Sequence, residues 1–204
     1  SVVRVLDGHL GRLLDGLEET PVADRVTLLL VSDHGMAPVP EDRVVYLDDY
    51  ADLDGVRGLY NATQALLYFG DDTTRVAEVH AALRDLPHAT AYRKGETPDR
   101  WHYGEGRRIP ELIVAAEPGW VVRSRDWRPW SGGGTHGWDP YYRPMQGIFL
   151  ATGPGIRSGV DIPAFENVHI YPFVARLLGL EPADGIDGRL DVLQPILLEP
   201  VMAP

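Results

Sequence analysis

The chain has 204 residues, with 19 Lys and Arg against 30 Asp and Glu and a formal net charge of -11 at pH 7. This acidic balance argues against nucleic-acid binding and against binding to anionic membranes, both of which need a basic face. The chain has no cysteine, which excludes a disulfide framework, a thiolate zinc cluster and a Cys nucleophile. Any metal must therefore be bound by His, Asp or Glu. No apolar run reaches the roughly 20 residues that a membrane span requires.

The first elements predict an α/β arrangement. Residues 2–19 carry apolar side chains at helical spacing, which predicts a surface helix. Residues 26–31 are almost entirely apolar, as is typical of a strand in the middle of a sheet that helices cover on both faces. The polar segment 32–38 follows this strand. Sheets of this class place their sites at the carboxyl ends of strands.

Residues 43–128 follow a different order, which predicts a small inserted α+β subdomain. A helix is expected over 73–86, with Thr73 or Thr74 as its cap. Short strands are expected on both sides of this helix, at 44–47, 65–69, 89–93, 111–116 and 120–123.

The last part of the chain returns to the core. A strand is expected over 145–152, and a helix over 168–178 with Pro172 in its first turn and Gly179 at its end. The predicted domain organisation is a core part with the first metal-ligand motif, the insertion, and a core part with the second metal-ligand loop and the closing helix, at 1–42, 43–128 and 129–204.

Asp33 and His34 stand at the end of the apolar strand. One interpretation is a pair of ligands for zinc or a similar divalent ion, because carboxylate oxygen and imidazole nitrogen both suit such a metal. The other is a turn Asp that caps a following helix, beside an ordinary His. The residues alone leave both open.

His136 lies in a loop with four glycines, at 132–134 and 137. Glycines permit a sharp turn and a close approach of the backbone. The loop therefore either presents His136 as a metal ligand or is a flexible surface loop. A phosphate-binding loop is disfavoured, because no Lys-Ser or Lys-Thr follows and the glycines do not begin a helix.

Other candidate residues have ordinary explanations. Asp7 and His9 are two apart on the predicted helix and cannot share one ion. The acidic stretch 48–54 lacks the alternation of a calcium loop. The glycosylation pattern at 61–63 is too frequent by chance to carry weight.

Four segments, taken in order, resemble one known family. The segment 31–36, Val-Ser-Asp-His-Gly-Met, is similar to the signature of the nucleotide pyrophosphatase/phosphodiesterase family, within the alkaline phosphatase superfamily. Residues 100–120 resemble the family's inserted region, 134–154 its third metal segment, and 166–180 its closing helix. The resemblance covers nearly the whole chain and implies an alkaline-phosphatase-like α/β/α core, present in part, with a small α+β inserted subdomain.

The resemblance also implies a chemistry. Family members use two zinc ions and a Thr or Ser nucleophile to hydrolyse phosphodiester or pyrophosphate bonds. By this analogy Asp33 and His34 hold the ion that bears the nucleophile, and His136 holds the other. Asp139 lies behind the ligand loop and receives no direct role.

The family's first half, which supplies the nucleophile and the remaining ligands, has no counterpart in the chain. We therefore expect the chain to be the carboxyl-terminal part of such an enzyme and, by itself, to bind zinc weakly, to be inactive and to associate with itself. The substrate is expected to be a small phosphodiester or a nucleotide, in a bacterial protein that acts outside the cytoplasm. Two alternatives stay open: a non-catalytic fragment or binding module, and a phosphomonoesterase, sulfatase or phosphonate hydrolase of the same superfamily.

Overall fold

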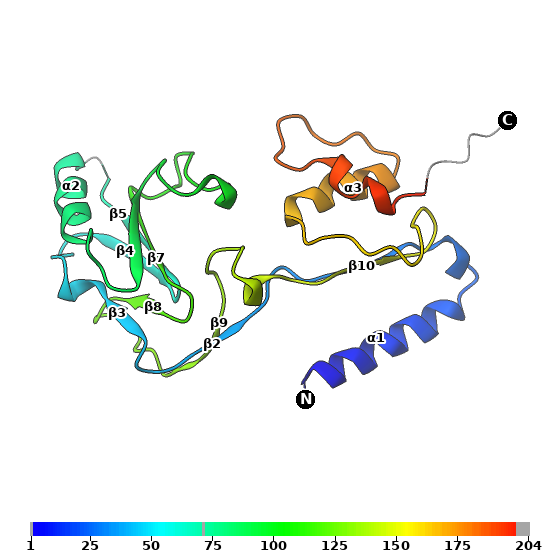
Figure 1. Cartoon of the computed structure of the whole chain (residues 1–204), viewed down its shortest axis with the longest axis horizontal. Coiled ribbons are helices and arrows are strands. Elements are labelled where there is room, and N and C mark those ends of the chain that lie inside the picture. Colours follow the sequence, from blue (N-terminus) through cyan, green and yellow to red (C-terminus); the bar gives the residue numbers. More distant parts are fainter. Residues whose placement is uncertain (1, 71, 199–204) are drawn as a thin grey trace. The chain divides into compact units, whose positions relative to one another are not determined.

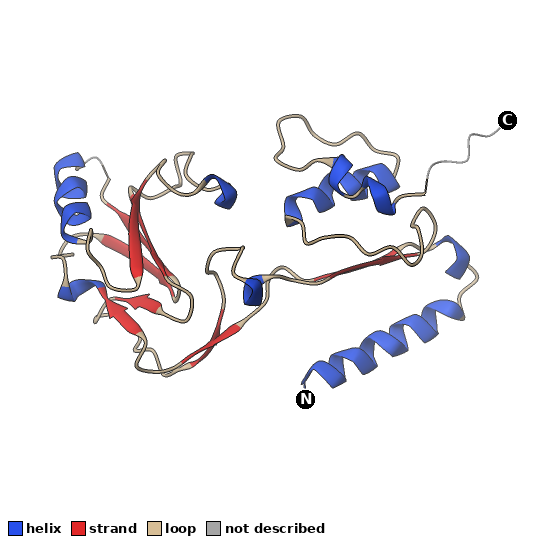
Figure 2. Ribbon diagram, in the orientation of Figure 1, coloured by secondary structure: helices blue, strands red, loops and turns tan. Residues whose placement is uncertain are grey.

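The computed structural model describes residues 2–70 and 72–198. It divides into two compact units, Ser1–Val31 with Ile148–Pro204 and, separately, Ser32–Gly147. Both units combine helices with strands (Figures 1 and 2). The outer predicted domains also include Ser1 and 199–204, which lie outside the described residues. Among the described helices, none is long and apolar enough to cross a membrane.

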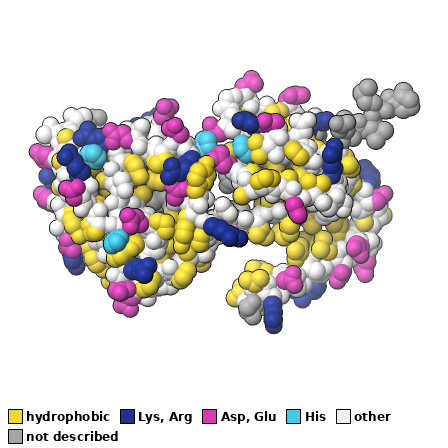
Figure 3. Space-filling view, in the orientation of Figure 1, with side chains coloured by type: hydrophobic (Ala, Val, Ile, Leu, Met, Phe, Trp, Pro, Cys, Tyr) yellow, Lys and Arg dark blue, Asp and Glu magenta, His cyan; other side chains and the backbone are white. Residues whose placement is uncertain are grey.

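The first unit begins with the predicted surface helix, α1 (Val2–Glu18), of which no residue is buried. Its apolar side chains lie at helical spacing, yet several are exposed, including Leu6 at 61%. Figure 3 shows hydrophobic side chains at the surface of this helix. A short 3₁₀ turn (Ala23–Arg25) then leads to β1 (Leu28–Val31).

Strand β1 departs from the expected position in the middle of a sheet. Within the described residues it pairs with one strand, the antiparallel β10 (Phe149–Thr152). Leu29, Phe149 and Ala151 pack against a core. Because side chains alternate along a strand, Leu30 and its partner Leu150 face the other way, and Leu150 is 61% exposed. The apolar composition of this strand therefore reflects a second face that the described residues cover only in part.

Helix α3 (Ile170–Leu177) covers the packed face of the β1–β10 pair, through a core centred on the fully buried Phe173. A 3₁₀ turn (Asn167–His169) precedes the helix, and Pro172 lies in its first turn as predicted. Gly179 ends it with φ +67°, and the N–H of Leu180 donates to the carbonyl of Ala175 (2.9 Å). Two further 3₁₀ turns follow, at Leu190–Val192 and Gln194–Ile196. Leu193, which lies between them, and Ile196 are buried in this core.

The second unit is built around an antiparallel sheet of four strands in the order β4–β5–β7–β6. These strands are β4 (Arg57–Asn61), β5 (Gln64–Tyr68), β6 (Ala89–Arg93) and β7 (Leu112–Ala116). Strands β5, β6 and β7 fall where the sequence predicts strands. Strand β4 was not predicted, because its exposed and half-buried residues alternate without a clear apolar run.

Helix α2 (Thr73–Ala82) begins at the predicted residue but ends four residues before the predicted end at 86. Its cap is Asp72, whose side chain accepts from the N–H of Arg75 (2.9 Å), and not Thr73 or Thr74. An Asp capping side chain fixes the helix start as well as a Thr does. The helix ends before Leu83, which is fully buried in the core.

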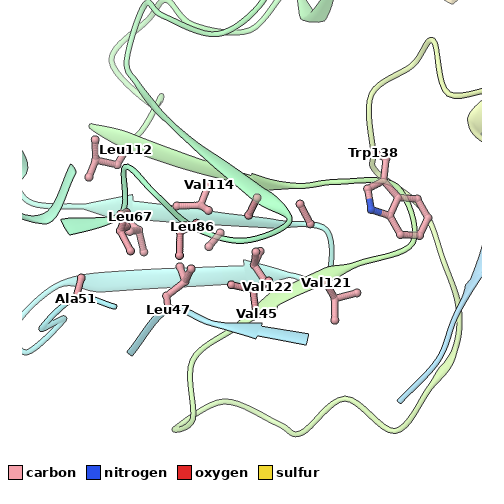
Figure 4. Packing of buried hydrophobic residues seen from close by; sticks show 14 of the residues in the cluster. Val45, Leu47, Ala51, Leu67, Leu86, Leu112, Val114, Val121, Val122 and Trp138 are labelled. Atoms are coloured by element: carbon pink, nitrogen blue, oxygen red, sulfur yellow. The ribbon is translucent and has the colours of Figure 1, made fainter. Parts of the chain in front are cut away.

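Two smaller pairs complete the second unit. Strand β3 (Val44–Tyr46) runs parallel to β8 (Val121–Arg123), while β2 (Ala37–Val39) pairs antiparallel with β9 (Gly133–Thr135). The core joins side chains of both the parallel pair and the four-stranded sheet, among them Leu47, Leu67, Val114 and Val122 (Figure 4). The strand predicted over 145–152 is shorter, since Met145 ends a 3₁₀ turn (Arg143–Met145). The boundaries of the insertion at 43 and 128 stay a prediction.

Candidate functional site

Asp33 and His34 follow β1 and belong to the second unit. The ring Nδ1–H of His34 donates to the carbonyl of Gly35 (2.7 Å), while the backbone N–H of His34 donates to Oδ1 of Asp33 (3.0 Å). A carbonyl only accepts, so the Nδ1 of His34 carries a proton. The Nε2 of the same ring lies 3.5 Å from Oδ2 of Asp33. The two groups form an ion pair when the ring is protonated, and they offer two acceptor atoms to a cation when the ring is neutral.

The β2–β9 pair brings His136 to His34. Ala37 pairs with Thr135 in the antiparallel register. His34 precedes β2 and His136 directly follows β9, so the pairing of these strands brings the two histidines together. Their rings stack with centroids 3.6 Å apart and planes 12° from parallel.

This geometry fits two incomplete metal sites better than a single one. Ligands about 2.0–2.2 Å from a tetrahedral zinc lie about 3.3 Å from each other, close to the separation of Asp33 Oδ2 and His34 Nε2. An imidazole lone pair lies in the plane of its ring. Two stacked rings therefore cannot direct their lone pairs to one ion, and His136 suits a second one. Among the described residues, no three His, Asp or Glu side chains form a group that could hold a metal.

The His136 loop is fixed by the turn between β4 and β5, by the start of β5 and by the residue that precedes β8. The hydroxyl of Thr63, which is 1% exposed, donates to the carbonyl of His136 (3.1 Å). The side-chain amide of Gln64 donates to the carbonyl of Gly137 (2.7 Å). The indole N–H of Trp138 donates to the carbonyl of Trp120 (3.0 Å). A loop held at three successive residues is not the flexible surface loop of the alternative interpretation.

We expect Gly137→Ala to destabilise this loop strongly. Gly137 has φ +104°, and an added Cβ would lie 2.6 Å from Oγ1 of the buried Thr63. Backbone strain and overpacking together should lower the free energy of unfolding by about 2–4 kcal/mol. Gly55→Ala is the matched control, because Gly55 has φ +72° with no atom near its added Cβ, and we expect a loss of about 1 kcal/mol. Equal losses in urea unfolding would contradict this assignment of the clash.

The remaining sequence candidates are engaged elsewhere. On α1, the side chain of Arg12 contacts Nδ1 of His9. In the acidic stretch, Asp49 forms a two-pronged ion pair with Arg125 (2.8 and 2.6 Å), and Asp52 pairs with Arg75 (2.9 Å). These two carboxylates therefore have arginine partners within the second unit.

Sequence analysis missed the residues that support the site. In the sequence, Thr63 stands out only as part of a glycosylation pattern that is frequent by chance, and Gln64 does not stand out. Asp139 received no role, yet its carboxylate contacts both Arg100 and Trp101. No spacing rule links these residues to their partners. Gln64 and Gly137 are 73 positions apart, and Arg100 and Asp139 are 39 positions apart.

The comparisons with known proteins agree with the resemblance. The family model described as type I phosphodiesterase/nucleotide pyrophosphatase matches residues 1–139. The human ectonucleotide pyrophosphatase/phosphodiesterase family member 7 is 31% identical over 97% of this chain and 44% of its own length. The Xenopus laevis bis(5'-adenosyl)-triphosphatase is 31% identical over 91% of this chain and 40% of its own length. The chain belongs to the type I phosphodiesterase/nucleotide pyrophosphatase family.

Solved structures match the fold closely. Human ectonucleotide pyrophosphatase/phosphodiesterase 5 superposes with a TM-score of 0.88 at 30% identity, over 97% of this chain and 52% of that one. An inactive murine form of the same enzyme in complex with AMP gives a TM-score of 0.84. These matches confirm the partial alkaline-phosphatase-like α/β fold and membership in a family of hydrolases. The chain spans about half the length of the solved relatives and less of the curated ones.

Proposed function

We propose that this chain is the carboxyl-terminal part of a zinc-dependent nucleotide pyrophosphatase/phosphodiesterase. Asp33 and His34 serve one zinc ion, and His136 serves a second. Bound zinc would neutralise negative charge that develops on the phosphate during hydrolysis. The chain's own contribution is to hold these three side chains at the spacing that two ions require.

The stacked pair of His34 and His136 carries this proposal. Rings with centroids 3.6 Å apart, in nearly parallel planes, support two ions side by side. The Nε2 atom of His34 and the Oδ2 atom of Asp33 supply adjacent donors on one side. Histidine and aspartate are the zinc ligands that a chain without cysteine has available.

The complementary part of the fold supplies the rest of the site. A catalytic zinc takes about three protein ligands, whereas this chain offers two for one ion and one for the other. The chain covers 52% of the matching human structure, which leaves room for the missing ligands and for a Thr or Ser nucleophile in the other half. The apolar face of β1 and β10 is consistent with a sheet that continues into that half.

The substrate class follows from the relatives. Their names describe nucleotide pyrophosphatases, phosphodiesterases and a bis(5'-adenosyl)-triphosphatase, and one matching structure holds AMP. We propose a small phosphodiester or nucleotide substrate for the complete enzyme.

Zinc titration of the 204-residue chain tests the ligand assignment. We expect His34→Ala and His136→Ala each to weaken zinc binding by at least about tenfold at its own site. His80→Ala is the control, because His80 contacts Arg93 and belongs to neither site. Competition with a chelating dye gives the affinities. Unchanged zinc binding in both site variants would refute the proposal.

A further inference from the structure

The carboxylate of Asp139 accepts hydrogen bonds from the nearby Tyr141 and from one distant turn. Its Oδ1 accepts from the backbone N–H of Tyr141 (2.9 Å) and from Nε of Arg100 (3.2 Å). Its Oδ2 accepts from Nε of Arg100 (3.0 Å), from the Arg100 Nη2 and from the indole N–H of Trp101 (3.2 Å). Arg100 and Trp101 lie in a 3₁₀ turn (Asp99–Trp101) between β6 and β7. The carboxylate thus joins this turn to the chain that leaves the His136 loop.

The contact between Asp139 and Arg100 fixes the orientation of the two side chains more than it stabilises the fold. The planar guanidinium of Arg100 approaches the carboxylate with two nitrogens, an arrangement that fixes orientation as well as distance. The guanidinium also lies over the ring of Tyr141, 5.6 Å from its centroid. The hydrogen bonds from Arg100 lower the pKa of Asp139 below its ordinary value of 3.8, so the pair is intact at neutral pH. A partly exposed ion pair stabilises a fold only weakly, which leaves placement of the loop as its main effect.

The position of this contact relates it to His136. Thr63 and Gln64 hold the carbonyls of His136 and Gly137, at the start of the loop. Gly137 has φ +104° and no side chain to restrict its rotation. On the far side of this glycine, Trp138 is anchored to Trp120, and Asp139 adds a second anchor one residue further on. Without Asp139, Trp138 alone anchors this side of Gly137, and the His136 ring loses part of the support that keeps it beside His34.

We propose that Asp139 is a positioning residue, which through its contacts with Arg100 and Trp101 holds the His136 ring in its stacked place beside His34. This inference rests on the proposed function for its zinc consequences. The placement of the ring itself does not depend on zinc. The inserted four-stranded sheet and the Asp99–Trp101 turn thereby act as a frame for a metal ligand that lies outside them.

Two variants from opposite sides of the contact test the proposal in the 204-residue chain. Asp139→Ala removes the acceptor, and Arg100→Met removes the main donor while keeping the apolar stem. In zinc-free protein, stacking should move the ring-proton NMR signals of His34 and His136 upfield. We expect both variants to lose this upfield shift and to weaken zinc binding by about tenfold, as loss of a supporting contact around a metal ligand does.

Asp49→Asn is the matched control. It breaks a similar two-pronged pair with Arg125 in the same unit, and it should change neither the ring shifts nor zinc affinity. Thermal unfolding of each variant separates a folded chain from an unfolded one. If Asp139→Ala fails to fold, Arg100→Met decides the test.

The two readouts separate this inference from the proposed function. Loss of the ring shifts in the variants of a chain that binds no zinc would refute the metal assignment and support the role of Asp139. Ring shifts that persist in the folded variants, or that are absent from the unaltered chain, would overturn the role of Asp139.

Discussion

The purified 204-residue chain is expected to hydrolyse a nitrophenyl nucleotide ester no faster than zinc in buffer does. The proposed nucleophile and the remaining zinc ligands lie in the complementary half of the fold, and an incomplete site cannot position a hydroxyl for attack on phosphorus. A longer protein that carries both halves should turn the ester over. In that protein, His136→Ala should lower kcat/KM by at least about a thousandfold, because one metal site is lost.

The control for this comparison is His80→Ala in the longer protein, which should keep full activity. Release of nitrophenolate, followed by absorbance with and without a chelator, measures all three proteins. Metal-dependent turnover by the 204-residue chain that disappears in His136→Ala would show that the chain holds a complete site, contrary to the proposal.

Phe173→Ala should produce the largest loss of stability in the first unit. Phe173 is fully buried and contacts the ring of Phe149 edge to face, with centroids 6.0 Å apart. Among the residues that the structure describes, the core around it has three other buried members, Ile156, Leu193 and Ile196. Removal of a buried phenyl ring lowers the free energy of unfolding by about 3–5 kcal/mol, which is a large share of what a small core supplies.

Leu150→Ala is the matched control for this substitution. Leu150 is also apolar and lies on β10, next to Phe149, but it faces away from the core and is 61% exposed. We expect it to change the free energy of unfolding by no more than about 0.5 kcal/mol. Denaturant unfolding followed by circular dichroism measures both variants, and similar losses would contradict the assignment of the two faces.

Much of the fold could be predicted from the apolar pattern. Strands β5, β6 and β7 and helices α1 and α3 lie where periodicity places them. Strand β9 escaped prediction because glycines make up most of it, and a strand without side chains shows no pattern. Strand β1 was expected in the middle of a sheet, whereas among the described residues it pairs with β10 and packs one of its faces against a core.

The sequence singles out the three candidate ligands but not the residues that support them. Asp33, His34 and His136 stand out because polar groups beside apolar strands or glycines are conspicuous in a sequence. Thr63, Gln64 and Arg100 act through tertiary hydrogen bonds, which depend on strand register and leave no local mark. The ligand roles of the three predicted residues, self-association, a bacterial source and a location outside the cytoplasm stay predictions.

The position of bound zinc tests the central claim most directly. Anomalous diffraction at the zinc edge, from crystals of the longer protein that carries both halves, should show two peaks about 4 Å apart. One peak should lie within bonding distance of Asp33 and His34, and the other within bonding distance of His136. A single ion shared by His34 and His136, or zinc bound away from all three residues, would contradict the account.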